Sequence, residues 1–142
     1  MNIIGLFKSI PVYVLLYKNR IKIYRLDTGK SIDKNSQKPF SNSRLLLGNF
    51  QRFEVFLKDS LKQLFFEDNY ILPPSLLMLM HQIEMKEDGV TEVEQRALVD
   101  SGKHSNAKEI YLYFGDNELT LTEAFKKIKN KKGSYSITKN KI

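Results

Sequence analysis

The pattern of hydrophobic and polar residues between positions 76 and 114 predicts a β-strand, an α-helix and a second β-strand in succession. Leu76–Met85 is apolar almost without interruption, which is typical of a strand covered on both faces. Thr91 and Glu94 have the spacing of a capping box, which marks the start of a helix. The second strand is expected at Glu109–Phe114. Strand, helix and strand in this order form the βαβ unit of a parallel sheet.

The helix that follows Thr91 is expected to bury one face. Val93, Ala97 and Leu98 form its apolar stripe, while the opposite face is polar. Gly102 and Asn106 are its expected stop signals, because glycine and asparagine readily adopt the left-handed conformation that ends helices.

The N-terminal part of the chain predicts a β-hairpin. Val12–Tyr17 and Arg20–Leu26 have strand character, and Lys18–Asn19 between them suits a tight turn. A third short strand is expected around residues 31–34. One face of the second strand carries Ile21, Ile23 and Arg25.

Large apolar residues recur at three- and four-residue spacing between Asn49 and Phe66, which predicts a helix packed on the sheet. The members of this stripe are Phe50, Phe53, Phe56, Leu57, Leu61 and Leu64. Burial of each such side chain is worth roughly 1.5–3 kcal/mol, so the helix should help to hold the core together. Pro73–Pro74 break the chain before the next strand. A last helix is expected at Leu119–Ile128, capped by Thr120 or Thr122.

Together these elements predict one α/β domain with a mixed sheet and helices packed on it. A β-hairpin or three-stranded meander would come first, followed by α-β-α-β. The chain has 142 residues, 42% of them hydrophobic, which is enough for a core of its own. Residues 1–122 would form the domain, and residues 123–142 the end of the last helix and a basic, disordered tail.

Several classes of protein are disfavoured by composition. The chain contains no cysteine, which excludes disulfides, a thiolate nucleophile and cysteine-ligated zinc. The apolar run at residues 10–17 is too short to span a bilayer, so no transmembrane segment and a cytoplasmic location are expected.

The net charge of +7 is unevenly distributed. Residues 1–50 carry nine basic and two acidic side chains, a net charge of +7. Residues 51–122 carry seven basic and thirteen acidic side chains, a net charge of −6. Residues 123–142 carry seven basic side chains and one acidic, a net charge of +6. The middle of the chain is therefore acidic, and both ends are basic.

Two kinds of site, a phosphate-binding loop and a two-metal nuclease centre, lack residues that they require. Gly29-Lys30-Ser31 ends like a Walker A motif, but Tyr24 stands where that motif needs its first glycine. A two-metal nuclease needs a carboxylate on its first strand. Glu54 and Glu84 could supply other ligands, but the strand VYVLLY contains no acid.

The remaining polar residues do not form a catalytic set. His81 lies in an apolar strand and is expected to be buried and hydrogen-bonded, while His104 should interact with the end of a helix. Ser60 and Ser101 lack the sequence context of a hydrolase nucleophile. No enzyme activity and no cofactor are therefore expected.

Acidic residues gather between positions 84 and 94. They are Glu84, Glu87, Asp88, Glu92 and Glu94. Solvated carboxylates favoured by the dipole of the following helix account for such a cluster, and a metal site is the alternative.

Stretches of the sequence also resemble two known families. DGVTEVEQRAL…SNAKEIYLY (residues 88–113) resembles a strand-helix-strand segment of the bacterial actin-like MreB family, and weaker similarity extends to residues 12–27 and 44–64. The stretch from PFSNSRLLLGNF to IEMKEDGVTEVEQRAL resembles the YjaA-like family of small enterobacterial proteins, described as stress-related. Over residues 11–115, these resemblances imply a single actin-like, ribonuclease-H-like subdomain. The hairpin LLYKNRIKI lacks the acid, glycine and threonine of the actin-family phosphate loop, so the resemblance does not imply ATPase activity.

These features predict a non-catalytic protein-interaction or regulatory module with an unidentified protein partner. The alternative is non-specific binding of nucleic acid or an anionic surface by basic residues near the C-terminus. These residues are Lys126, Lys127, Lys129, Lys131, Lys132, Lys139 and Lys141. An immunity or inhibitor protein that binds a toxin is a close variant of the first hypothesis.

Overall fold

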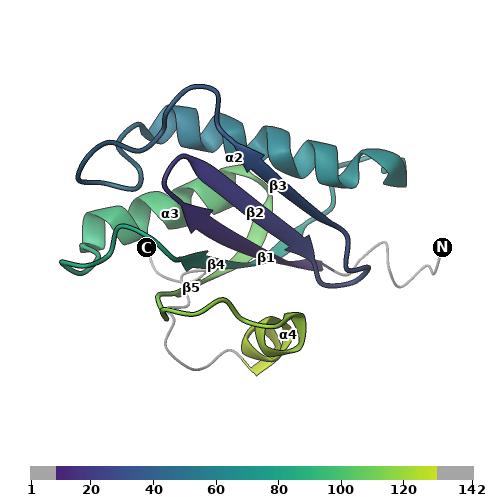
Figure 1. Cartoon of the computed structure of the whole chain (residues 1–142). Helices are drawn as coiled ribbons and strands as arrows, with labels where there is room; N and C mark the ends of the chain where they lie inside the picture. Colours follow the sequence, from purple (N-terminus) through teal and green to yellow (C-terminus); the bar gives the residue numbers. More distant parts are fainter. Residues whose placement is uncertain (1–8, 131–142) are drawn as a thin grey trace.

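The computed structural model describes residues 9–130. Their strands form one five-stranded mixed sheet with the order β3-β2-β1-β4-β5 (Figure 1). An antiparallel meander is made of β1 (Ile10–Tyr17), β2 (Arg20–Arg25) and β3 (Ser31–Asn35). Two further strands run parallel to β1 on its other side, namely β4 (Leu76–Gln82) and β5 (Ala107–Tyr113). The predicted hairpin is therefore part of a three-stranded meander.

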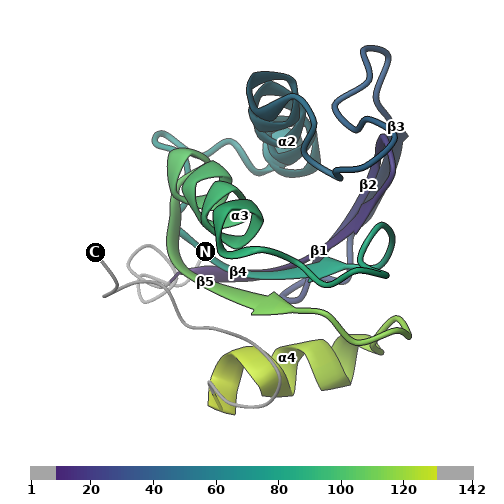
Figure 2. The same ribbon diagram turned by 90° about the vertical axis from the view of Figure 1, so that its left-hand side faces the viewer.

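Helices cover both faces of the sheet. α2 (Phe50–Phe65) and the short 3-10 helix η1 (Phe66–Asp68) connect β3 to β4, α3 (Glu92–His104) connects β4 to β5, and α4 (Leu121–Asn130) follows β5. α2 and α3 lie on one face and α4 on the other (Figure 2). The predicted α/β class and the α-β-α-β succession are confirmed.

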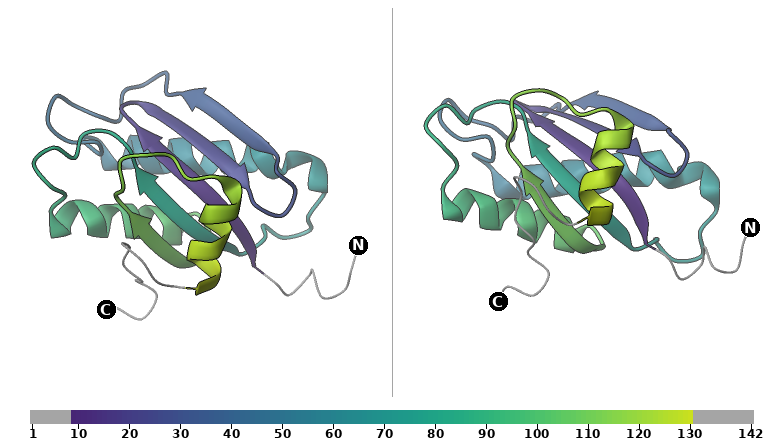
Figure 3. Two further views of the ribbon diagram at one scale, coloured as in Figure 1. Left: turned by 60° about the horizontal axis from the view of Figure 1, so that its bottom comes forward. Right: turned by 90° about the horizontal axis from the view of Figure 1, so that it is seen from below.

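β1 supplies side chains to two separate cores. Val12, Val14 and Leu16 are buried in the cluster that also contains the apolar residues of α2 and α3. Their neighbours Tyr13, Leu15 and Tyr17 are buried in the cluster that contains Ala124 and Ile128 of α4. α4 lies across β1 and β4 on this second face (Figure 3). A strand buried on both faces has no polar alternation, as the sequences of β1 and β4 show.

The helix starts follow from local hydrogen bonds. The Asn49 side chain accepts from the amide of Arg52 at 3.0 Å and caps α2. Both bonds of the predicted capping box at Thr91 and Glu94 are present. Thr120 caps α4, which runs two residues further than expected, to Asn130.

The predicted apolar stripe of α3 is partly wrong. Val93 is 80% exposed, and the buried residues of the helix are instead Leu98, Val99, Ser101 and Gly102. Side chains on a helix lean towards its N-terminus, so a residue in the first turn points past the start of the helix.

Gly102 does not end α3 as predicted but lies inside its last turn, facing the sheet. A Cβ atom at this position would lie 2.7 Å from Cδ1 of Ile110 and 3.4 Å from Sδ of Met78. Glycine therefore allows the helix to approach β5 closely. Asn106, with φ 73°, supplies the left-handed conformation after the helix, as predicted.

Within residues 9–130, no helix is long and apolar enough to cross a membrane. The predicted C-terminal tail is described only as far as Asn130, where it forms most of α4. Residues 131–142 lie outside the described residues.

Replacing Gly102 tests the close packing of α3 on the sheet. We expect Gly102→Val to lower the free energy of unfolding by about 1–3 kcal/mol through overpacking. Adding Ile110→Val removes the Cδ1 atom that the new side chain meets, so the double variant should lose less stability than the two single changes predict. Urea denaturation measures all three variants, and strictly additive losses would contradict this packing.

Candidate functional site

A hollow bordered by exposed apolar residues lies where α2 and α3 end. It has a volume of about 770 Å³ and lies between the last turns of the two helices and the segment that leads from α2 to β4. The residues that line it are Lys58, Leu61, Lys62, Phe65, Phe66, Asn69, Tyr70, Ile71, Pro73, Pro74, Leu76, Lys103, His104, Ser105 and Asn106. We call this hollow the α2–α3 groove.

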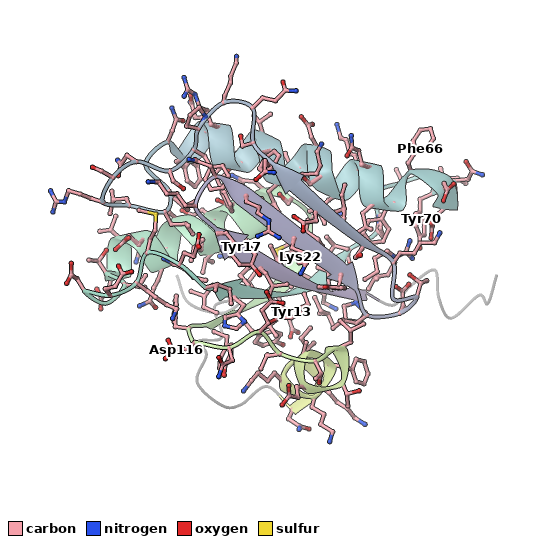
Figure 4. The ribbon with its side chains drawn as sticks, in the orientation of Figure 1. Tyr13, Tyr17, Lys22, Phe66, Tyr70 and Asp116 are labelled. Atoms are coloured by element: carbon pink, nitrogen blue, oxygen red, sulfur yellow. The ribbon has the colours of Figure 1, made fainter. Side chains whose placement is uncertain are left out.

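Large apolar side chains stand exposed along one wall of the α2–α3 groove. Phe66 is 80% exposed and Ile71 is 98% exposed, and the neighbouring Leu72 is 75% exposed. Figure 4 shows Phe66 and Tyr70 at the end of α2, where Phe66 points away from the domain. Since contiguous exposed apolar groups are unfavourable in water, such a cluster is typical of an interaction surface.

Basic side chains also line the groove. Lys58 and Lys62 belong to the last turns of α2, and Lys103 and His104 to the last turn of α3. Glu54 accepts from His104 Nδ1 at 2.7 Å and lies 3.9 Å from Lys58 Nζ. Within residues 9–130, no carboxylate forms an ion pair with Lys62 or Lys103. These two ammonium groups therefore give the groove an uncompensated positive charge.

A buried arginine fixes the apolar wall. Arg25 is 1% exposed, and its guanidinium lies 4.2 Å from the ring centre of Phe65. Its Nη2 donates to Asp27 at 2.8 Å, and its Nη1 forms an ion pair with Asp68 of η1 at 2.9 Å. The Phe65 ring in turn packs against Tyr70. The end of β2 is thus tied to the segment that carries Phe66 and Ile71.

As predicted, Arg25 shares one face of β2 with Ile21 and Ile23, and all three side chains are buried. Its acidic partners lie 2 and 43 residues away in sequence, at Asp27 and Asp68. No sequence pattern identifies the second of these, because chain folding alone brings η1 to the end of β2.

His81 is buried and hydrogen-bonded, as predicted, and lies in the core on the other face of the sheet. Its Nε2 lies 2.6 Å from the carbonyl oxygen of Gly115, which can only accept, so we assign the proton to Nε2. Nδ1 then accepts from the Tyr13 hydroxyl at 2.7 Å. The Tyr13 oxygen accepts from the amide of Leu119 at 3.0 Å. This chain of bonds ties β1 and β4 to the loop before α4.

Burial determines the protonation of both rings. It lowers the pKa of His81 and raises the pKa of Tyr13. Neutral side chains satisfy every bond of the network, whereas a protonated His81 would leave the Tyr13 O–H without an acceptor. The arrangement therefore serves to hold the structure together and offers no exchangeable acid or base to solvent.

The other candidate catalytic groups are engaged within the fold. Ser60 and Ser101 donate to the carbonyl oxygens of Phe56 and Ala97, one turn back in their own helices. His104 lies in the last turn of α3, as predicted, and also lines the α2–α3 groove.

The acidic residues at 84–94 do not converge. Glu84 accepts from the backbone amide of Lys18 at 2.8 Å, and Glu94 belongs to the capping box. Glu87, Asp88 and Glu92 are exposed. Within residues 9–130, no group of three or more histidines and carboxylates is arranged to hold a metal ion.

Three of the seven lysines proposed to bind anions lie within the described residues, and they differ in exposure. Lys126 and Lys129 are exposed on α4, whereas Lys127 is half-buried with its Nζ 4.4 Å from the ring centre of Tyr113. The remaining four, Lys131, Lys132, Lys139 and Lys141, lie outside the described residues.

A known protein is similar in sequence to this chain, although the match does not come from a family model. No family model matches the chain. The chain is 30% identical over 90 residues to the uncharacterized protein YjaA of Escherichia coli (strain K12), which corresponds to 61% of this chain and 69% of that protein.

Neutral His81 should make the stability of the protein depend on pH. Because burial lowers its pKa in the folded state, the unfolded chain takes up a proton at pH values where the folded chain does not. The contribution of His81 is therefore complete above pH ~6.5 and decreases as the pH falls from there towards the folded-state pKa. A His104→Gln background leaves His81 as the single histidine.

Urea denaturation at several pH values measures this effect. The free energy of unfolding should decrease below pH ~6.5 in the His104→Gln chain and decrease less after Tyr13→Phe and His81→Leu are added. Identical pH profiles for the two chains would contradict the proposed protonation.

Removal of Arg25 should destabilise the domain and loosen the wall of the groove. Arg25→Met leaves Asp68 unpaired and is expected to cost about 3 kcal/mol, at the lower end for a broken buried pair because both acids are partly exposed. Arg20→Met is the matched control, since its ion pair with Asp33 is at the surface and should contribute less than about 1 kcal/mol. Equal losses in chemical denaturation of the two variants would contradict this role of Arg25.

Proposed function

The chain belongs to the same family as YjaA, and we propose that it is a non-catalytic protein-interaction module that binds its partner through the α2–α3 groove. The observation that carries this proposal is the cluster of exposed apolar side chains at Phe66, Ile71 and Leu72. Arg25 holds Phe65 and Asp68 at the start of this segment, and the Asn106 side chain donates to the carbonyl oxygens of Pro73 and Pro74 at its end. A fixed, apolar and concave surface is suited to a protein partner.

We infer further that the domain is a single actin-like, ribonuclease-H-like subdomain. The element order supports this inference, since a three-stranded meander is followed by α-β-α-β, as the resemblance to the MreB family implies. The turn at Lys18–Asn19 occupies the position of the family's phosphate loop. It contains none of the residues that such a loop needs, which favours a role without nucleotide.

We propose also that the domain has no enzyme activity. His81 is enclosed by Tyr13 and Gly115, and the hydroxyl groups of Ser60 and Ser101 bond within their own helices. Groups held in this way are not available to a substrate. Two narrower roles fit an interaction module, namely a regulator in a stress response and an inhibitor that neutralises a toxin. The identity of the partner would distinguish between them.

Binding of nucleic acid or an anionic surface is the second candidate. It is favoured by Lys126 and Lys129, which are exposed close together on α4. Half-buried Lys127 contributes to the packing of α4 on Tyr113 and is less suited to such contacts.

Site-specific photo-crosslinking tests the proposal in cells. A photoreactive phenylalanine derivative at position 71 should give an adduct with one defined protein. The same group at position 55 should not, although Val55 is also exposed, because it lies outside the α2–α3 groove. The adduct should persist after nuclease treatment and in a chain that ends at Asn130.

Loss of the adduct on nuclease treatment, or on removal of residues 131–142, would assign the binding to the basic C-terminal region. Absence of any adduct specific to position 71 would contradict a role for the groove.

A further inference from the structure

We infer that the α2–α3 groove binds an acidic segment of a partner protein, which inserts at least one large aliphatic or aromatic side chain between Phe66 and the end of α3. This inference rests on the proposed function and adds the chemistry of the partner. It follows from the combination of an exposed apolar wall with two unpaired ammonium groups.

The apolar wall determines the anchor. Phe66 and Ile71 line the groove and are 80% and 98% exposed, and Leu72 beside Ile71 is 75% exposed. The buried side chains that also line the groove are Leu61, Phe65 and Leu76. A large apolar side chain seated here would contact both the exposed wall and the core beneath it. Central apolar anchors of this kind account for most of the affinity of protein interfaces.

The charges determine what flanks the anchor. Lys62 and Lys103 are exposed on different helices at the rim of the same hollow, and neither is engaged by a carboxylate of residues 9–130. Glu67, beside Phe66, lies 3.7 Å from Lys30, so its charge is partly offset. Acidic residues on both sides of the anchor would therefore meet complementary charge.

Helix dipoles alone do not account for this surface. Basic residues are expected in the last turn of any helix, which explains Lys62 and Lys103 individually. The dipoles do not explain why three large apolar side chains stand exposed in the segment next to them.

A protein segment fits the groove better than a nucleic acid. Sites for single-stranded nucleic acid use aromatic rings on which bases stack, and a basic track for the phosphates. Here two of the three exposed apolar residues, Ile71 and Leu72, are branched aliphatic chains. Two unpaired lysines would neutralise few phosphates.

A second copy of this chain fits less well than a separate partner. Its own acidic region, residues 84–94, exposes one large apolar side chain, Val93. Glu84 and Glu94 of that region are already engaged by Lys18 and Thr91. One valine is too small to cover Phe66, Ile71 and Leu72 together.

Selection of peptides from a random displayed library on the purified full-length chain tests the inference. The selected peptides should combine a large apolar residue with neighbouring aspartate or glutamate. Their affinity, measured by fluorescence anisotropy, should fall by about tenfold or more for Lys62→Glu/Lys103→Glu, a change of about 1.4 kcal/mol or more. It should be nearly unchanged for Lys38→Glu/Lys108→Glu, which makes the same charge change at exposed lysines outside the groove. Circular dichroism and thermal unfolding confirm that each variant is folded.

Other outcomes would overturn the inference. These are selected peptides without acidic residues, equal loss of affinity in both pairs of variants, or displacement of the peptides by a single-stranded oligonucleotide. Self-association of the chain that is abolished by Lys62→Glu/Lys103→Glu would make a second copy the occupant. If the crosslink at position 71 persists while the selected peptides lack acids, the proposed function stands and only the acidic partner is excluded.

Discussion

The structure depends on the pairing of β1 at the centre of the sheet. β1 is antiparallel to β2 on one side and parallel to β4 on the other, and all but one of its residues are buried. Its alternate side chains fill two different cores, one made of aliphatic and phenylalanine side chains and one rich in tyrosine. A register shift of one residue would exchange these two sets, so both cores fix the same register. Every helix packs on a sheet that this strand holds together.

The two faces of the sheet have different roles. One face is covered by α2 and α3, whose last turns define the α2–α3 groove together with the segment that returns to β4. The other face is covered by the short helix α4 and contains the hydrogen bonds between His81, Tyr13 and Leu119. His81 and Tyr13 are therefore part of a structural core, while Phe66 and Ile71 are exposed at the α2–α3 groove.

The shape of the groove depends on the path of the chain after α2. Arg25 holds Asp68 and Phe65, so the chain is fixed at the end of the helix and the next residues extend over the surface. Asn69 adopts a left-handed conformation, with φ 52°, and Pro73–Pro74 lead into β4. The side chain of Asn106 donates to the carbonyl oxygens of Pro73 and Pro74, so the segment that presents Phe66 and Ile71 to solvent is held at both ends. Such a surface can bind a partner without first paying the entropy of ordering a loop.

The sequence by itself determined the elements and their class. Capping residues, strand turns and the spacing of apolar residues act over a few positions, so the hairpin, α2 and the βαβ unit could be predicted from Asn19, the Phe53–Leu64 stripe and Thr91. Contacts between distant segments were beyond such patterns. Three features involve residues from different elements: the approach of Gly102 to Ile110, the pairing of Arg25 with Asp68, and the placement of Lys62 and Lys103 at one groove. Only the tertiary structure decided these, because local hydrogen bonding and periodicity specify each element separately, whereas packing of the elements on one sheet specifies which of their side chains meet.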